Sequence, residues 1–128
     1  MKISVIIART LLGLIFLVFG LNFFLHFIPM SPAPGKAGAF EGGLMESGYF
    51  FQFLKVIEVA GGLFLIINRY TVFFLLLLFP ITLNICMFHA FLEPAGLPLG
   101  GLMLVLHLFL GWAYFKYFSP IFTSQPAA

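Results

Sequence analysis

Three side chains of types that bind metals recur within one short segment, TLNICMFHAFLEPAG at residues 82–96. Cys86, His89 and Glu93 are spaced by three and four residues, so they share one face of a helix. Ligands in a row along a straight helix spread over about 10 Å, too far to close around one ion. A site would need His89, Glu93 and a further ligand such as His26. We therefore expect no metal site, and we interpret His89 and Glu93 as the point where an apolar helix reaches water.

Two residues of opposite charge interrupt another apolar segment, FLKVIEVAGG at residues 53–62. Lys55 and Glu58 are three residues apart, so they lie on one helix face and can touch. Each charge near a bilayer centre costs about 2.5–3.5 kcal/mol, whereas each large apolar residue returns about 0.3–0.6 kcal/mol. The helix must therefore turn its charged face toward other helices, where Gly61 and Gly62 allow a neighbouring backbone to approach. Two interpretations stay open for Glu58: a carboxyl that binds a ligand or proton, and one half of a structural ion pair.

A histidine lies at a similar depth in a later apolar segment. His107 belongs to a stripe of small and polar residues at spacings of three and four, which predicts that this face packs against protein. The stripe also contains Gly100, Met103, Gly111 and Tyr114. A lone histidine in such a stripe is more often a hydrogen-bonded packing residue than a ligand.

Five polar residues from different apolar segments could meet in the outer half of a bundle, below a long loop. They are Asn22, Lys55, Glu58, Asn84 and His107. The functional hypothesis is a polar pocket that opens toward this loop and binds a ligand or a proton. The alternative is hydrogen bonding that only orders the helices, at about 0.6–2 kcal/mol per contact.

The composition explains why these polar residues stand out. Of the 128 residues, 62% are hydrophobic and only 8% are charged, whereas soluble domains carry about 25% charged residues. The apolar residues form long blocks, which predicts an integral membrane protein with one domain. The net charge of +2 comes from scattered residues, so a nucleic-acid surface is excluded. Cys86 is the only cysteine, which excludes an internal disulfide or thiol relay unless a partner supplies the second sulfur.

The blocks predict an all-α, integral membrane four-helix bundle formed by residues 1–128. A spanning helix needs about 20 apolar residues, and four segments qualify at about 3–28, 48–68, 71–92 and 98–118. Residues 29–47, rich in Pro, Gly and Ala, form the only long loop, which we expect to be irregular. The short turn at residues 68–70 makes the second and third helices antiparallel neighbours.

The basic residues predict the orientation. Lys2, Arg9, Arg69 and Lys116 fall on one side of the four-span arrangement, and the side with the long loop carries most of the glutamates. The positive-inside rule then places both termini in the cytoplasm. Because the first segment exceeds the bilayer thickness, we expect its beginning to lie along the interface, with Arg9 extended toward the headgroups.

The sequence resembles the DoxX family of small four-helix bacterial membrane proteins. The resemblance rests on ARTLLGLIFLVFG, VIEVAGGLFLIINRY, the apolar third segment and WAYFKYF, which together cover nearly the whole chain. It implies a bundle in the bacterial cytoplasmic (inner) membrane and an association with quinone-linked sulfur oxidation, from thiosulfate to quinone. Arg9, Glu58 and Arg69 fall within the matching stretches, so they are the best candidates for family-type positions.

These observations predict an accessory or quinone-proximal subunit of a membrane oxidoreductase. No intrinsic cofactor is predicted, quinone is the candidate ligand, and the redox centre belongs to a partner membrane subunit. Glu58 or His107 could exchange the quinol proton. The alternative is a non-enzymatic module that binds a lipid or partner subunit. A third hypothesis is a small transporter or proton pathway through Lys55, Glu58 and His107, which would need a homo-oligomer because four helices form a narrow bundle.

Overall fold

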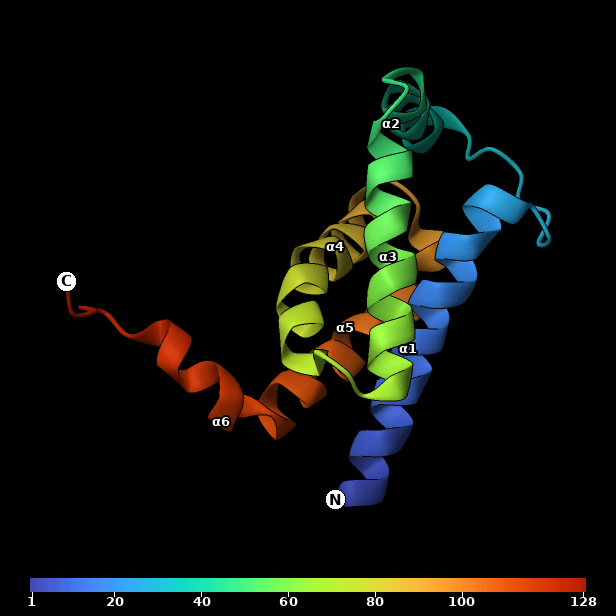
Figure 1. Cartoon of the computed structure of the whole chain (residues 1–128). Helices are drawn as coiled ribbons and strands as arrows, with labels where there is room; N and C mark the ends of the chain where they lie inside the picture. The colour runs from blue at the N-terminus through green and yellow to red at the C-terminus, as the bar shows by residue number, and fades with distance from the viewer.

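The computed structural model describes residues 1–128 and contains four helices that are long and apolar enough to cross a membrane (Figure 1). They are α1 (Lys2–Leu25), α3 (Phe50–Ile67), α4 (Thr71–Phe91) and α5 (Leu97–Ala113), the last preceded by the 3-10 turn η1 (Pro94–Gly96). The shorter elements are α2 (Gly35–Glu46), α6 (Phe115–Phe118) and the 3-10 turn η2 (Ser119–Phe122). The prediction of an all-α chain with four long apolar helices is confirmed.

The four long helices form a closed bundle in which each helix has two neighbours. Helix α1 packs against α3 and α5, and α4 packs against the same two helices from the other side. At one end, which we call the loop end, α2 and η1 connect the long helices (Figure 1). At the opposite end, which we call the basic end, α1 begins, α3 turns into α4, and α5 stops.

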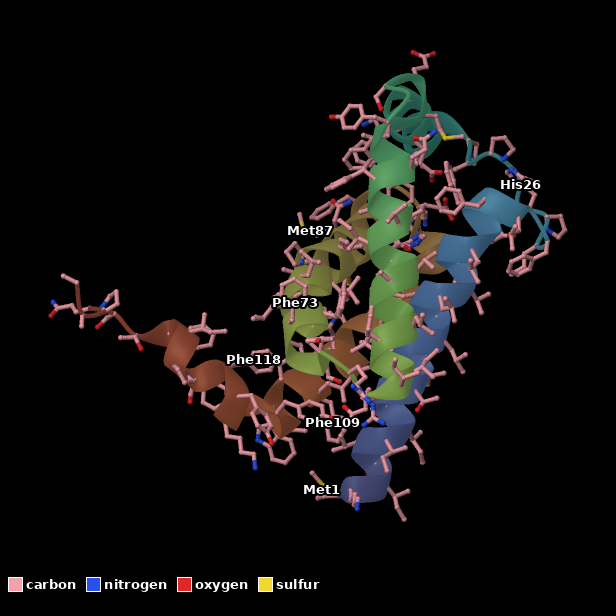
Figure 2. The ribbon with its side chains drawn as sticks, in the orientation of Figure 1. Met1, His26, Phe73, Met87, Phe109 and Phe118 are labelled. Atoms are coloured by element: carbon pink, nitrogen blue, oxygen red, sulfur yellow. The ribbon has the colours of Figure 1, made fainter.

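Apolar side chains fill the bundle and also cover its outside. The buried core draws on all four long helices and on α6; its members are Ala8, Leu12, Phe16, Leu65, Leu75, Leu78, Met103, Leu110 and Phe118. Large apolar residues such as Phe73, Met87 and Val105 are exposed, and the first two lie on the outer face of α4 (Figure 2). Helices that are apolar on every side are typical of a bundle surrounded by lipid.

Glycines bring the backbones of α1 and α3 close together. A Cβ atom placed on Gly62 would lie 2.6 Å from both the Gly13 carbonyl oxygen and the Leu17 amide nitrogen. On the other side of α3, a Cβ atom on Gly61 would lie 2.7 Å from the Leu78 side chain of α4. The prediction that Gly61 and Gly62 permit close approach of neighbouring helices is therefore confirmed.

The α3–α4 connection is as short as the sequence predicted. Asn68 and Tyr70 both adopt left-handed backbone conformations, with φ of 55° and 52°. The Arg69 amide donates to the Phe64 carbonyl oxygen at 3.0 Å, which ends α3. The chain then reverses at once, and α3 and α4 are in contact.

The long connection differs from the prediction of an irregular loop. Its prolines, at positions 29, 32 and 34, all precede α2, so no residue of α2 lacks a backbone donor. Ala37 of α2 is buried, and α2 contacts α3. The prediction is therefore wrong over Gly35–Glu46, where the chain forms a helix that packs on the loop end.

The last long helix is shorter than predicted. Helix α5 ends at Ala113, and Tyr114 departs from helical geometry with φ of −101° and ψ of 17°. Phe118 of α6 still packs against the core, and beyond it the chain extends away from the bundle (Figure 1). The predicted helix at 98–118 is therefore two elements with different directions, separated at Tyr114.

Candidate functional site

The strongest candidate site begins with an ion pair in α3. The Lys55 Nζ atom lies 3.3 Å from Glu58 Oε1. Glu58 is only 2% exposed, whereas the Lys55 side chain is 19% exposed. Glycine makes room for the pair, because a Cβ atom on Gly20 of α1 would lie 3.3 Å from the Glu58 Cβ atom. The prediction that α3 turns this charged face toward its companion helices is confirmed.

Further ionisable side chains lie at the loop end, within electrostatic range of Lys55 or of one another. Glu41 of α2 lies within electrostatic range of Glu93, His89 and Lys55. Burial raises the pKa of the Glu41 carboxyl above its ordinary value, the nearby Glu93 raises it further, and His89 and Lys55 act in the opposite direction. We call these four residues together with Glu58 the loop-end cluster.

The sequence prediction missed the part that Glu41 plays in this cluster. It placed Glu41 in a loop, and a loop residue has no defined distance to Lys55 or Glu93. Helix α2 fixes that distance because it packs on α3 with Ala37 buried at 1% exposure. A proline-free run of twelve residues directly after Pro34 was the available signal for this helix.

Beside the cluster, α2 and α4 form an apolar groove of about 240 Å³. We call it the outer groove, and its lining residues are Phe40, Asn84, Met87, Phe88, Phe91 and Leu92. The rings of Phe40 and Phe88 are 5.8 Å apart between centroids. Asn84 is exposed and is the only polar residue of this lining. Its predicted place inside the bundle is therefore wrong, because α4 turns Asn84 outward.

Both ring nitrogens of His107 have hydrogen-bond partners inside the bundle. Its Nε2 atom lies 2.7 Å from the Leu75 carbonyl oxygen and its Nδ1 atom 2.9 Å from Thr82 Oγ1. A carbonyl can only accept, so Nε2–H donates to Leu75, and Nδ1 of the neutral ring accepts from the Thr82 hydroxyl. The two hydrogen bonds connect α5 to α4, and His107 is only 3% exposed.

Asn22 also has its polar groups occupied. Its Oδ1 atom accepts from the Ile28 amide at 2.7 Å, and its Nδ2 group donates to the Ile28 carbonyl oxygen at 3.2 Å. These bonds hold the chain where it leaves α1 and reverses direction at His26, whose φ is 53°. The five residues predicted to form one pocket are therefore arranged in three different ways. Lys55 and Glu58 form an ion pair, Asn22 and His107 are hydrogen-bonded to other residues, and Asn84 faces outward.

Of the three residues of metal-binding type, His89 takes part in ending α4. His89 Nδ1 lies 3.1 Å from the Glu93 carbonyl oxygen, to which it donates when protonated at that nitrogen. Cys86 is half-buried and unpaired. No group of three His, Cys, Asp or Glu side chains is arranged to hold a metal ion.

Arg9 lies inside the basic end of the bundle. Its Nε group donates to the Leu65 carbonyl oxygen at 2.9 Å, and one Nη1 hydrogen is directed to the Tyr114 hydroxyl oxygen at 3.2 Å. Arg9 is 9% exposed. Helix α1 is continuous from Lys2, and both acceptors of Arg9 lie between the helices. The expectation that Arg9 extends toward the headgroups stays a prediction.

The fold and these sites define a small helical bundle with four helices able to cross a membrane and with ionisable residues buried between them. No protein-family model matches the sequence, and no curated protein or solved structure is significantly similar to it. The resemblance to the DoxX family therefore stays a prediction.

Proposed function

We propose that the four long helices span a bacterial cytoplasmic membrane with both termini in the cytoplasm. The charge distribution supports this orientation. Lys2, Arg69 and Lys116 lie at the basic end with Arg9, whereas three of the four glutamates, Glu41, Glu46 and Glu93, lie at the loop end. An excess of basic residues on one side is typical of the cytoplasmic face.

We further infer that the protein is a DoxX-like, quinone-proximal accessory subunit of a membrane oxidoreductase. The observation that carries this proposal is the outer groove beside the loop-end cluster. The groove combines aromatic and aliphatic walls with one polar residue, Asn84, which is the pattern expected for a lipophilic ligand oriented by few hydrogen bonds. Three groove residues are direct sequence neighbours of cluster residues: Phe40 of Glu41, Phe88 of His89, and Leu92 of Glu93.

The residues of this chain would hold a quinone ring and manage its protons. Quinones take up protons together with electrons when they are reduced. The Asn84 amide can donate a hydrogen bond to a ring carbonyl, and the rings of Phe40 and Phe88, tilted by 34° against each other, can contact the quinone ring. Glu41 is suited to proton exchange because its raised pKa lies closer to neutrality than that of an ordinary carboxyl. Lys55 connects this region to the buried Glu58.

Electron transfer itself is assigned to a partner subunit in this proposal. The chain has one cysteine and no haem attachment motif. The role of the protein would be to bind the quinone next to the partner's redox centre and to supply protons through the loop-end cluster.

The test is saturable binding of a short-chain quinone by the purified full chain in detergent, measured by equilibrium dialysis. Asn84→Leu should weaken binding about fivefold, the value of one net hydrogen bond. Gln52→Leu is the matched control because it removes an exposed amide from α3 and should leave binding unchanged. Absence of saturable binding, together with quinone-linked activity that is insensitive to Glu58→Gln, would contradict the proposal.

A second candidate is a non-enzymatic assembly module, and the C-terminal arm favours it. Apart from Phe118, which packs against the core, residues 115–122 extend away from the bundle (Figure 1). Phe115, Tyr117, Ile121 and Phe122 are each more than half exposed. Purification in mild detergent separates the two candidates. A stoichiometric partner without a redox centre supports assembly, whereas a partner that carries flavin, haem or molybdenum supports the oxidoreductase.

A further inference from the structure

A cavity of about 640 Å³ opens at the basic end, opposite the loop-end cluster and separate from the outer groove. We call it the basic cavity. Its polar lining comes from α1, the α3–α4 turn and the region where α5 ends; these residues are Lys2, Arg9, Asn68, Tyr114, Lys116 and Tyr117. Three of them are cations, and none is an acid.

The buried cation of this cavity has no counter-charge. Arg9 is 9% exposed, and its two hydrogen-bond partners, the Leu65 carbonyl and the Tyr114 hydroxyl, are neutral. The only salt bridge of the protein joins Lys55 to Glu58. A guanidinium withdrawn from water is costly unless an anion compensates it, and its remaining N–H groups are free to donate to one.

The neutral polar residues of the cavity are arranged to donate. The Tyr114 oxygen accepts from Arg9, so its own hydroxyl hydrogen stays available. The Asn68 Oδ1 atom accepts from the Thr71 hydroxyl at 2.7 Å, which leaves the Asn68 Nδ2 group as a donor. Lys116 Nζ lies 5.0 Å from the centre of the Tyr117 ring, which holds the ammonium beside the cavity.

Cations and N–H or O–H donors around one cavity, without any carboxylate, are the recognition pattern of a phosphate group. The cavity lies where α1 begins and α5 ends, which is headgroup depth if these helices span a bilayer. Val5, Ile6 and Ala113 complete its wall with apolar surface, suited to the glycerol and first methylenes of a lipid.

We propose that the basic cavity binds the phosphate of an anionic phospholipid headgroup. Arg9 and Tyr114 form its inner wall, and Lys2 and Lys116 contact the anion from the rim. A free inorganic phosphate shares this chemistry, so the experiment must distinguish the two sources.

The test is native mass spectrometry of the full chain in detergent, titrated with short-chain phosphatidylglycerol, short-chain phosphatidylcholine or inorganic phosphate. Phosphatidylglycerol should bind more tightly than phosphatidylcholine. Lys2→Gln and Lys116→Gln should each weaken phosphatidylglycerol binding about fivefold, the value of one basic residue near an anionic lipid. Both positions are exposed, so these variants keep the fold.

Lys36→Gln is the matched control because it removes the same charge from α2 at the loop end, and it should leave binding unchanged. Equal binding of the two lipids, or equal weakening by Lys36→Gln, would overturn the proposal. Saturable binding of inorganic phosphate without a preference for phosphatidylglycerol would overturn the lipid assignment. Tyr114→Phe adds a second readout, because it removes one donor without changing charge and should weaken phosphatidylglycerol binding by a smaller factor than either lysine variant.

Discussion

At the loop end, Lys55 and Glu58 compensate each other across 3.3 Å, and Glu41, His89 and Glu93 add charges of both signs nearby. At the basic end, Arg9 is nearly as buried but meets only neutral acceptors. Both ends are built from equally apolar helices, so the surroundings do not explain the difference. The loop end contains its own counter-charges, whereas the basic end must obtain one from outside the chain.

This difference separates two kinds of buried charge. A self-compensated pair can hold a protonatable group in the bundle without a ligand, which suits proton exchange. An uncompensated guanidinium instead creates affinity for an anion, because the anion removes a cost that the fold itself leaves in place. Variants at the two ends should therefore respond differently to removal of one charge.

The largest effect is expected at the loop-end pair. Lys55→Met should lower the free energy of unfolding by about 3 kcal/mol, because it leaves the Glu58 carboxyl buried without its partner. The double variant Lys55→Met/Glu58→Met should recover most of this loss, since no lone charge remains. The measurement is unfolding by SDS titration. If Lys55→Met were as stable as the wild type, the expected difference between the two ends would be contradicted.

The next largest effect on stability is expected at the close contact between α1 and α3. Gly62→Ala should cost about 2 kcal/mol by overpacking, because the new methyl meets backbone atoms of α1 at 2.6 Å and backbone cannot move aside as a side chain can. Gly101→Ala is the control, since a Cβ atom there has no neighbour within 4 Å. The same SDS titration should find Gly101→Ala unchanged or stabilised, and equal losses for both variants would refute the close contact.

The hydrogen bonds of His107 have a smaller effect. Thr82→Val removes the hydroxyl that donates to His107 Nδ1 at 2.9 Å and should cost about 1 kcal/mol. It should leave quinone binding in the outer groove unaltered, because His107 contacts α4 inside the bundle. Thr123→Val, which removes an exposed hydroxyl bonded to Pro120, is the control and should show no loss. Reduced quinone binding in Thr82→Val would indicate that His107 contributes to quinone binding.

The smallest expected effect is on pH dependence. The pKa of Glu41 is raised above 4.5 in the folded protein, first by burial and then by the charge of Glu93. A raised carboxyl pKa favours the folded state fully below the unfolded pKa, and this contribution is lost as pH rises through the folded pKa. From pH 4.5 upward, the wild type should therefore lose stability relative to Glu41→Gln in thermal unfolding scans. Parallel pH profiles would show that Glu41 is solvated like an ordinary surface carboxyl.

Local spacing made part of the fold and site predictable. The Lys55–Glu58 pair was predictable because residues three positions apart lie on one face of a helix. The tight α3–α4 turn was predictable because only a few residues separate two apolar blocks. Gly61 and Gly62 were predictable for the same reason, since small residues beside a buried charge indicate where helices approach.

Other features depend on how the helices are rotated against one another. Helix α4 has Leu, Phe and Ile on every side, so no sequence pattern fixes which way Asn84 points. The acceptors of Arg9 come from Leu65 and Tyr114, more than fifty residues away, and no local rule brings them to Arg9. The loop-end cluster needed α2, whose weak amphipathic pattern concealed a helix.

The contrast between the two ends is tested most directly by thermal stability in bicelles with and without phosphatidylglycerol. Lipid that binds the folded state raises its stability by mass action. Phosphatidylglycerol should stabilise the wild type and Lys55→Met/Glu58→Met equally, and should give little stabilisation to Lys2→Gln/Lys116→Gln. Stabilisation that persists in Lys2→Gln/Lys116→Gln, or that disappears in Lys55→Met/Glu58→Met, would contradict an anion requirement confined to the basic end.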